Sequence, residues 1–190
     1  MPLTKAKFRQ TCLKKIKNTS IHNQFYRSAV LNEKLYKKLK KLKNKKILFF
    51  CPLPFEADIM KTLQKMRKNS EIFVPFMQGT SFKMVPFRLP LKKNKFGILE
   101  AGNTNRNIKN IDIAIVPAVG VDGNLQRIGF GKGMYDRFFE KLKKRPYTIF
   151  IQPEFCYTKE IICDHYDIAC DLLLTPKVEK VSMARVNKRI

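Results

Sequence analysis

The 190-residue sequence has no tryptophan, two histidines and only 15 acidic residues. It has no apolar run long enough to cross a membrane, and no apolar segment follows its charged N-terminus, where Lys5, Lys7 and Arg9 stand. These absences argue against a membrane-spanning protein and against a secretory signal peptide. We therefore expect a cytoplasmic protein with no membrane partner.

Cysteine pairs with short spacing are also missing. The five cysteines are odd in number and include no C-x-x-C pair; they are Cys12, Cys51, Cys156, Cys163 and Cys170. Disulfide frameworks belong mainly to oxidising compartments, so we expect reduced thiols. The last three cysteines, with His165 among them, are seven residues apart, whereas zinc ligands favour much closer spacing. Core or loop cysteines are therefore favoured over a zinc site or a cysteine nucleophile.

Positive charge, by contrast, is in excess. The 39 Lys and Arg residues give a net charge of +24. Such a chain attracts polyanions, including nucleotides, polycarboxylates and nucleic acid. The Lys-rich residues 34–46 lack the interleaved aromatic side chains of RNA-binding motifs. A solvated basic surface is therefore favoured, and a nucleic-acid-binding protein is kept as an alternative.

The order of apolar patterns predicts the fold. A hydrophobic fraction of 44% suits a single domain, which we expect over residues 1–190 with a frayed tail from about residue 180. Helical spacing occurs at 3–20, 22–43, 56–68 and 132–143. Strand-like runs occur at 47–51, 71–76, 82–87, 96–99, 111–119, 147–151 and 171–175. This alternation predicts an α/β fold, a three-layer sandwich around a mostly parallel sheet.

A glycine-rich segment follows the clearest strand, 111–119, at the sheet edge where α/β proteins bind ligands. Gly129, Gly131 and Gly133 occupy every second position just before the helix 132–143. Glycines allow close approach of the backbone, and N–H groups before a helix attract phosphates. Lys132 and Arg127 add mobile positive charge. The spacing fits neither the G-x-G-x-x-G nor the P-loop motif, so a phosphate loop is favoured and a ligand-free turn is the alternative.

The run from Pro117 to Arg137 resembles the signature of the 5-formyltetrahydrofolate cyclo-ligase family, P-x-x-x-F-D and then R-L-G-x-G-x-G-Y-Y-D-R. The matching residues are Pro117, Asp122, Arg127, Gly129, Gly131, Gly133, Tyr135, Asp136 and Arg137. Other segments resemble the family in the same order: Lys5 with Arg9, Glu56 to Asp58, Ile98 to Glu100, and His165 to Thr175. The chain departs from the family pattern at Ile59, Ala101, Phe130, Met134 and Pro176.

The resemblance implies an enzyme that uses ATP and Mg²⁺ to cyclise 5-formyltetrahydrofolate to 5,10-methenyltetrahydrofolate, releasing ADP and phosphate. The formyl oxygen would be phosphorylated and N10 would then attack. ATP would be bound by Lys5, Arg9, Arg127, Gly129, Phe130, Gly131, Lys132, Gly133, Met134, Tyr135 and Asp136. The catalytic residues would be Arg127, Lys132 and Tyr135. Folate would contact Glu56, Phe50 and Tyr135, and Mg²⁺ would be held by Asp136 and Asp167.

The substrate implied is a reduced folate, with or without a polyglutamate chain, and we expect a monomer that binds no nucleic acid. A third interpretation is another enzyme on a similar sheet, such as a sugar-phosphate isomerase. Such an enzyme would not need ATP, so dependence on ATP separates the two enzyme hypotheses.

Overall fold

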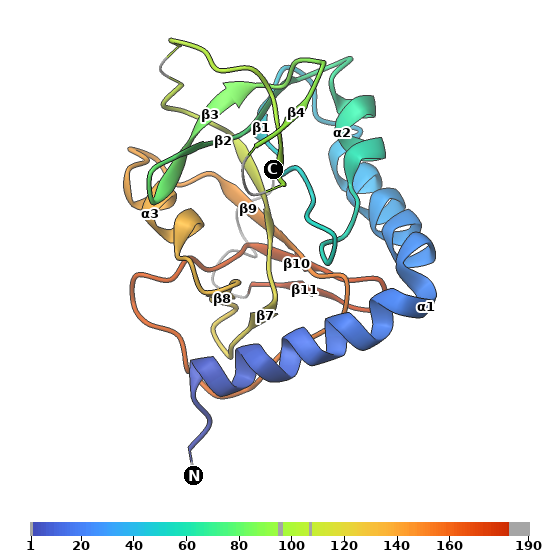
Figure 1. The fold of residues 1–190 in the computed structure, drawn as a ribbon, viewed down its shortest axis with the longest axis vertical. Helices are drawn as coiled ribbons and strands as arrows, with labels where there is room; N and C mark the ends of the chain where they lie inside the picture. Colours follow the sequence, from blue (N-terminus) through green and yellow to red (C-terminus); the bar gives the residue numbers. More distant parts are fainter. Residues whose placement is uncertain (1, 95–96, 107, 183–190) are drawn as a thin grey trace.

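A seven-stranded sheet runs through the centre of the molecule in the order β11-β10-β9-β6-β1-β2-β3 (Figure 1). This computed structural model describes residues 2–94, 97–106 and 108–182. The strands are β1 (Lys46–Leu48), β2 (Glu71–Gln78), β3 (Ser81–Pro86), β6 (Ile113–Pro117), β9 (Tyr147–Ile151), β10 (Leu172–Leu174) and β11 (Glu179–Val181). The five inner strands are parallel, and β3 and β11 pair antiparallel at the two edges. The expected mostly parallel sheet is confirmed.

The described residues form three helices: α1 (Lys5–Leu39), α2 (Met60–Met66) and α3 (Met134–Glu140). The second half of α1 and α2 pack on one face of the sheet, and α3 packs on the other. Successive residues of the buried strands alternate between these faces. In β6, Ile113 and Ile115 contact the first layer, whereas Ala114 and Val116 contact the second. The molecule is therefore a three-layer sandwich, as its sequence predicts.

Helix α1 bends at Asn23, whose backbone angles (φ −146°, ψ 21°) are not helical. The first segment, 5–22, runs along one edge of the molecule, and the second, 24–39, turns away beside α2 (Figure 1). At the helix start, the Thr4 side chain accepts a hydrogen bond from the N–H of Lys7. The two helices predicted on either side of residue 21 correspond to these segments. No helix among the described residues combines the length and apolarity of a membrane span.

Short strands and chain ends depart from the expected pattern. Strands β4 (Lys92–Lys93), β7 (Gly120–Val121), β8 (Arg127–Ile128) and β11 were not predicted, because two or three residues are too few for a periodic pattern. The run 96–99 is only partly described: Phe96 lies outside the described residues, and Leu99 belongs to β5 (Leu99–Glu100). Strand β11 extends to Val181, and most of the tail expected from about residue 180 lies outside the described residues.

A disulfide joins Cys12 to Cys156, so the expectation that all thiols are reduced is wrong. Cys12 lies on the first segment of α1, and Cys156 follows β9 in the chain. The two are 144 residues apart, and no local spacing could have indicated a pairing made by the tertiary fold. Cys51, Cys163 and Cys170 are free thiols.

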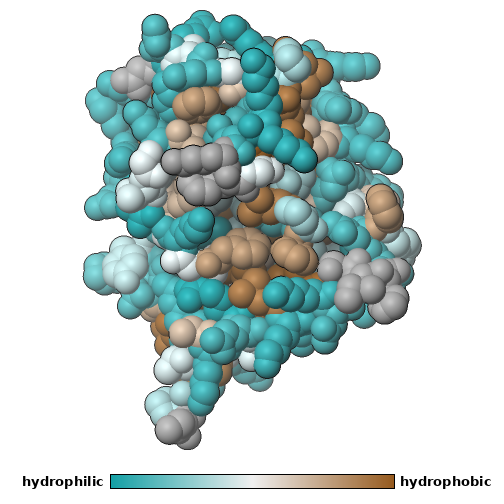
Figure 2. Space-filling model, in the orientation of Figure 1, coloured by the Kyte–Doolittle hydropathy of each residue, from teal (hydrophilic) through white to brown (hydrophobic). Residues whose placement is uncertain are grey.

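Hydrophilic side chains cover most of the face seen in Figure 2, and apolar residues show near its centre. The whole chain carries a net charge of +24. On the outer side of α1, Lys37, Lys38 and Lys40 are exposed. Lys37 and Lys38 form ion pairs with Glu33 and Glu179, so part of this charge is neutralised at the surface.

Candidate active site

Two adjoining cavities mark the site. An apolar pocket of about 320 Å³ opens at the carboxyl ends of β1 and β6. From these neighbouring strands the chain continues to opposite sides of the sheet, which is where α/β folds bind ligands. A larger groove, of about 1190 Å³, lies between the start of α1, the glycine loop and residues 165–169. Arg127, Lys132 and Gly133 line both cavities.

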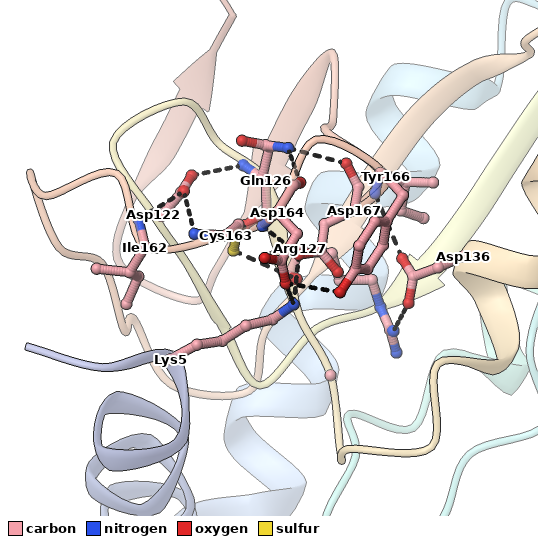
Figure 3. Close-up of polar contacts among 12 residues, drawn as sticks. Lys5, Asp122, Gln126, Arg127, Asp136, Ile162, Cys163, Asp164, Tyr166 and Asp167 are labelled. Carbon is pink, nitrogen blue, oxygen red and sulfur yellow. Dashed lines mark hydrogen bonds and ion pairs between the residues drawn. The ribbon is translucent and has the colours of Figure 1, made fainter.

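The buried Asp122 carboxylate shapes the loop that enters the site. Its Oδ1 accepts hydrogen bonds from the N–H groups of Asn124 (3.0 Å) and Gln126 (2.9 Å). Its Oδ2 accepts from the N–H groups of Ile162 (3.3 Å) and Cys163 (3.1 Å) (Figure 3). One carboxylate thus fixes two loops that are far apart in the chain. The sequence pattern included Asp122 but gave it no role.

Arg127 is a buried, fixed cation at the junction of the two cavities. Its Nε donates to the carbonyl oxygen of Pro117 (2.8 Å), and its guanidinium lies 4.8 Å from the centre of the Tyr135 ring. Nη1 is 3.9 Å from Asp136 Oδ2. Burial lowers the pKa of Arg127, and the charge of Asp136 opposes that shift. The expectation of a mobile Arg127 is therefore wrong, because these contacts hold its side chain in place.

The glycines of the loop are required by its geometry. A Cβ at Gly129 would lie 2.3 Å from Arg127 Nη1, so only glycine leaves room for the arginine. Gly131 (φ 100°) and Gly133 (φ 56°) have left-handed backbone conformations. Arg9 of α1 reaches this loop and donates from Nε to the carbonyl oxygen of Gly129 (2.8 Å). The contacts hold the loop in a shape that side chains at these positions would prevent.

The loop also keeps donors available. Within the described residues, no protein acceptor takes the backbone N–H groups of Gly129, Gly131 or Gly133. Arg137 donates to the carbonyl oxygens of Thr80 and Lys132 and so ties the loop to the β2–β3 turn. A rigid loop with free N–H groups is suited to binding phosphate oxygens.

Lys5 closes the other side of the groove (Figure 3). Its Nζ forms an ion pair with Asp167 and lies 3.3 Å from Asp164 Oδ2. The Asp167 carboxylate is buried and also accepts from the N–H of Asp164 (2.7 Å). Burial opposes the charge on Lys5, but the bonds and charges of Asp167 and Asp164 outweigh it and raise the Lys5 pKa.

The two carboxylates expected to bind metal line the same groove. Asp136, on α3, accepts from the N–H of Ile168 (3.3 Å) and faces Arg127, whereas Asp167 faces Lys5. In the parts of the chain that the structure describes, no cluster of three or more His, Cys, Asp or Glu side chains could hold a metal ion.

The expected ATP-binding residues divide between the two cavities. Lys5, Arg9, Gly129, Gly131 and Asp136 line the groove. Phe130, Met134 and Tyr135 line the apolar pocket instead, together with the expected folate contacts Phe50 and Glu56. The pocket is also lined by residues that the sequence did not identify as part of the site, namely Pro75, Met77, Phe82 and Glu100. The last of these accepts a hydrogen bond from the N–H of Met77 (2.9 Å), which anchors β5 beside β2.

Glu56 is the buried acidic group of the apolar pocket. Its Oε2 accepts from the N–H of Leu53 (2.9 Å). Burial raises the Glu56 pKa from 4.5 to about 7, whereas the Leu53 bond and the charge of Arg127 lower it. Burial likewise raises the pKa of the Tyr135 hydroxyl, which is therefore neutral at physiological pH. The pocket thus presents one carboxyl group that titrates near neutrality against mostly apolar walls.

A pH-dependent stability follows from Glu56. The unfolded chain loses this proton near pH 4.5 and the folded chain near pH 7, so the group lowers the free energy of unfolding as pH rises between these values. Glu56→Gln keeps an acceptor for Leu53 and should stabilise the protein by about 1–3 kcal/mol above pH 7, with little effect below pH 4.5. Urea unfolding at both pH values measures this. If Glu56→Gln changes the free energy of unfolding by the same amount at both pH values, the assignment to Glu56 is contradicted.

Fold and site together define a class of α/β protein in which a groove suited to phosphate meets an apolar pocket. Comparison with known proteins makes the class specific: the chain belongs to the 5-formyltetrahydrofolate cyclo-ligase family, whose model matches residues 3–176. The resemblance seen in the sequence is thereby confirmed.

Curated relatives and solved structures agree with this placement. The chain is 27% identical over 130 residues to a probable 5-formyltetrahydrofolate cyclo-ligase of Schizosaccharomyces pombe, a match covering 58% of this chain and 64% of that protein. It is 33% identical over 120 residues to the 5-formyltetrahydrofolate cyclo-ligase of Mycoplasma genitalium, covering 56% of this chain and 72% of the relative. The structure resembles the 5,10-methenyltetrahydrofolate synthetase of Aquifex aeolicus, with a TM-score of 0.79, 26% identity, and coverage of 99% and 96% of the two chains.

Proposed function

We propose that the chain uses ATP to close 5-formyltetrahydrofolate to 5,10-methenyltetrahydrofolate, with release of ADP and phosphate. The observation that carries the proposal is the meeting of groove and pocket at Arg127, Lys132 and Gly133. A nucleotide whose phosphates lie in the groove would present its terminal phosphate to a group at the mouth of the pocket. In the proposed reaction that group is the formyl oxygen of the folate, which is in keeping with the family to which the chain belongs.

The chemistry needs activation because the formyl oxygen is a poor leaving group. Transfer of the terminal phosphoryl group to this oxygen gives ADP. N10 then attacks the activated carbon and loses its proton, and the carbon–oxygen bond breaks to release phosphate. In such a reaction the protein mainly positions the reactants and neutralises charge. Arg127 and Lys132 supply the positive charge, and the Tyr135 ring packs against the Arg127 guanidinium.

Asp136 and Asp167 would hold Mg²⁺, whose shell typically takes one or two carboxylates plus phosphate and water oxygens. The donor set fits this use, because both carboxylates line the groove and each faces a cation, Arg127 or Lys5. Bound Mg²⁺ would neutralise phosphate charge. Asp136 accepts a hydrogen bond from the N–H of Ile168, and Asp167 accepts one from the N–H of Asp164. These bonds hold the two carboxylates in position.

Lys5 and Arg9 are the α1 residues that would bind the phosphates. Lys5→Met should raise the KM for ATP about tenfold, because it removes one charge-assisted contact. It should also lower the melting temperature, because the buried Asp167 carboxylate loses its ion-pair partner. Methionine is preferable to an acidic replacement, since Lys5 faces Asp164 and Asp167. The matched control is Lys40→Met, at an exposed position that caps the C-terminus of the same helix. If both variants change the KM equally, Lys5 has no special role at the groove.

The direct test is an assay with purified protein, 5-formyltetrahydrofolate, Mg²⁺ and ATP. Formation of the methenyl product is followed by its near-ultraviolet absorbance. No product, or equal product without ATP, would refute the proposed activity. Stabilisation against heat by RNA, and not by Mg-ATP with folate, would favour the nucleic-acid-binding alternative instead.

We also propose that the enzyme is cytoplasmic and monomeric. We further propose that it binds polyglutamylated folates more tightly than the monoglutamate. The basis is the net charge of +24, since each added glutamate brings a negative charge to a basic surface. Affinity should rise with glutamate number, and this gain should shrink as salt screens the charges. Binding titrations at low and high salt measure both effects. Equal affinities at low salt would contradict the proposal.

A further inference from the structure

We propose that Cys12 and Cys156 form a thiol–disulfide switch that sets the affinity of the groove for ATP. The switch would act by fastening or releasing the first segment of α1, residues 5–22, here called the arm. This inference rests on the proposed function in one respect, that the groove binds nucleotide phosphates. It adds a redox modification site and a physical link from that site to nucleotide binding.

The arm and the rest of α1 are attached to the molecule separately. Beyond the bend at Asn23, the second segment is anchored in the main core through Leu31, Leu35 and Leu39, all fully buried. The arm belongs to a smaller cluster, in which its side chains Phe8, Cys12 and Ile16 pack against Val119, Ile128 and Cys156. The non-helical backbone at Asn23 gives the helix a point about which the arm can move while the second segment stays in place.

The disulfide and the groove contacts share one face of the arm. Lys5, Arg9 and Cys12 are spaced by four and three residues, so they stand one above another on an α-helix. Lys5 contacts Asp167, Arg9 contacts the carbonyl oxygen of Gly129, and Cys12 is bonded to Cys156. A bond at Cys12 therefore holds the two cations over the groove, one turn and two turns away.

The partner of Cys12 is itself firmly fixed. The side chain of Gln152 accepts from the N–H of Cys156 (3.2 Å) and donates to its carbonyl oxygen (3.1 Å). The same carbonyl accepts from the N–H of Val121, next to Asp122 and its loop. Gly120 lets the arm approach closely, since a Cβ there would lie 3.0 Å from Cys12 Sγ. The disulfide thus ties the arm to the same framework that positions Arg127.

Reduction would leave the arm held by its small apolar cluster and its polar contacts alone. The reaction transfers two electrons and two protons from a thiol reductant, such as a pair of glutathione molecules, which becomes a disulfide as Cys12 and Cys156 become thiols. Both cysteines are buried, with exposures of 0% and 3%, so a reductant reaches them only when the arm lifts. ATP bound under the arm opposes that lifting, and coupling between two sites is reciprocal. Oxidation should therefore tighten ATP binding, and ATP should slow reduction.

Calorimetric titration of oxidised and reduced protein with Mg²⁺ and a non-hydrolysable ATP analogue tests the switch. We expect about tenfold weaker nucleotide binding after reduction, within the usual range of coupling between sites. The affinity for 5-formyltetrahydrofolate should not change, because none of the described side chains of α1 lines the apolar pocket. The double variant Cys12→Ser, Cys156→Ser should bind nucleotide like the reduced protein in either buffer. Cys170→Ser, which alters a buried free thiol, should keep the response of the parent.

Hydrogen exchange provides a second measurement. Reduction should speed amide exchange in residues 5–22 and not in 24–39, and the nucleotide should slow the loss of the disulfide in a glutathione buffer. Equal nucleotide affinity in both redox states, or a mass showing that no disulfide forms under oxidising conditions, overturns the switch. No nucleotide binding in either state refutes the proposed function instead, and faster exchange of the arm on reduction would still support the switch's mechanical part.

Discussion

Replacing Asp167 by asparagine should lower kcat about a hundredfold and raise the Mg²⁺ concentration needed for half-maximal activity, while the fold survives. A hundredfold loss of kcat is roughly the effect of removing one preorganised electrostatic contact to a reacting phosphate. Asp167 lines the groove and pairs with Lys5. In the proposed role, its carboxylate would exchange that cation for a metal ion when the nucleotide binds. Titrating Mg²⁺ against activity measures the effect directly.

Asp171 is the matched comparison, because it stands four residues further along and is even more deeply buried. Its Oδ2 accepts from the N–H of Thr148 (2.7 Å), and its Oδ1 lies 3.9 Å from Arg145 Nη2. These contacts tie the start of β10 to β9 and point to a structural role. Asp171→Asn should lower the free energy of unfolding by about 1–3 kcal/mol and leave the Mg²⁺ dependence unchanged. A shifted Mg²⁺ dependence in Asp171→Asn alone would reverse the two roles.

The central strands could be predicted from the sequence because burial on both faces leaves continuous apolar runs. The run 147–151 gives the bounds of β9, and Ile113–Pro117 lies inside the run 111–119. The layers follow from the same physics, since helices must cover both faces of such a sheet. What the pattern could not give was the set of pairings made between distant residues. The Cys12–Cys156 bond and the β7–β8 pair depend on the tertiary fold.

In the site, too, the sequence pattern predicted the loop but not the directions of its side chains. Alternating glycines identified the loop, because left-handed and crowded backbone positions favour that residue. The direction of each side chain was not accessible in this way. Phe130 stands inside the glycine run and Met134 directly follows it, yet both line the apolar pocket. Substitutions at these positions therefore bear on the apolar pocket, whereas Lys5, Arg9 and the glycine backbone line the groove.

Asp122→Ala should have the largest effect on folding of any substitution considered for this chain. Four backbone N–H groups, two in each of two loops, would lose one charged acceptor. Hydrogen bonds to a charged group contribute roughly 1.5–3 kcal/mol each, so a loss of about 4 kcal/mol or more is expected even when the effects are not additive. Against a typical stability of about 5–15 kcal/mol, that loss leaves little native protein in mild denaturant.

The substitution also tests how the loop serves the site. Asp122 holds Gln126 in place, and the next residue is Arg127, so any Asp122→Ala protein that still folds should have a misplaced arginine and little activity. Asp112→Ala is the matched control, since the Asp112 side chain accepts one hydrogen bond, from the N–H of Lys46 (2.8 Å), at an exposed position. That variant should lose about 1 kcal/mol and stay active. Asp122→Asn, which keeps one acceptor oxygen, should fall between the two. Urea unfolding of the three variants ranks them by their loss in the free energy of unfolding. Similar losses in Asp122→Ala and Asp112→Ala would show that Asp122 does not organise the loops.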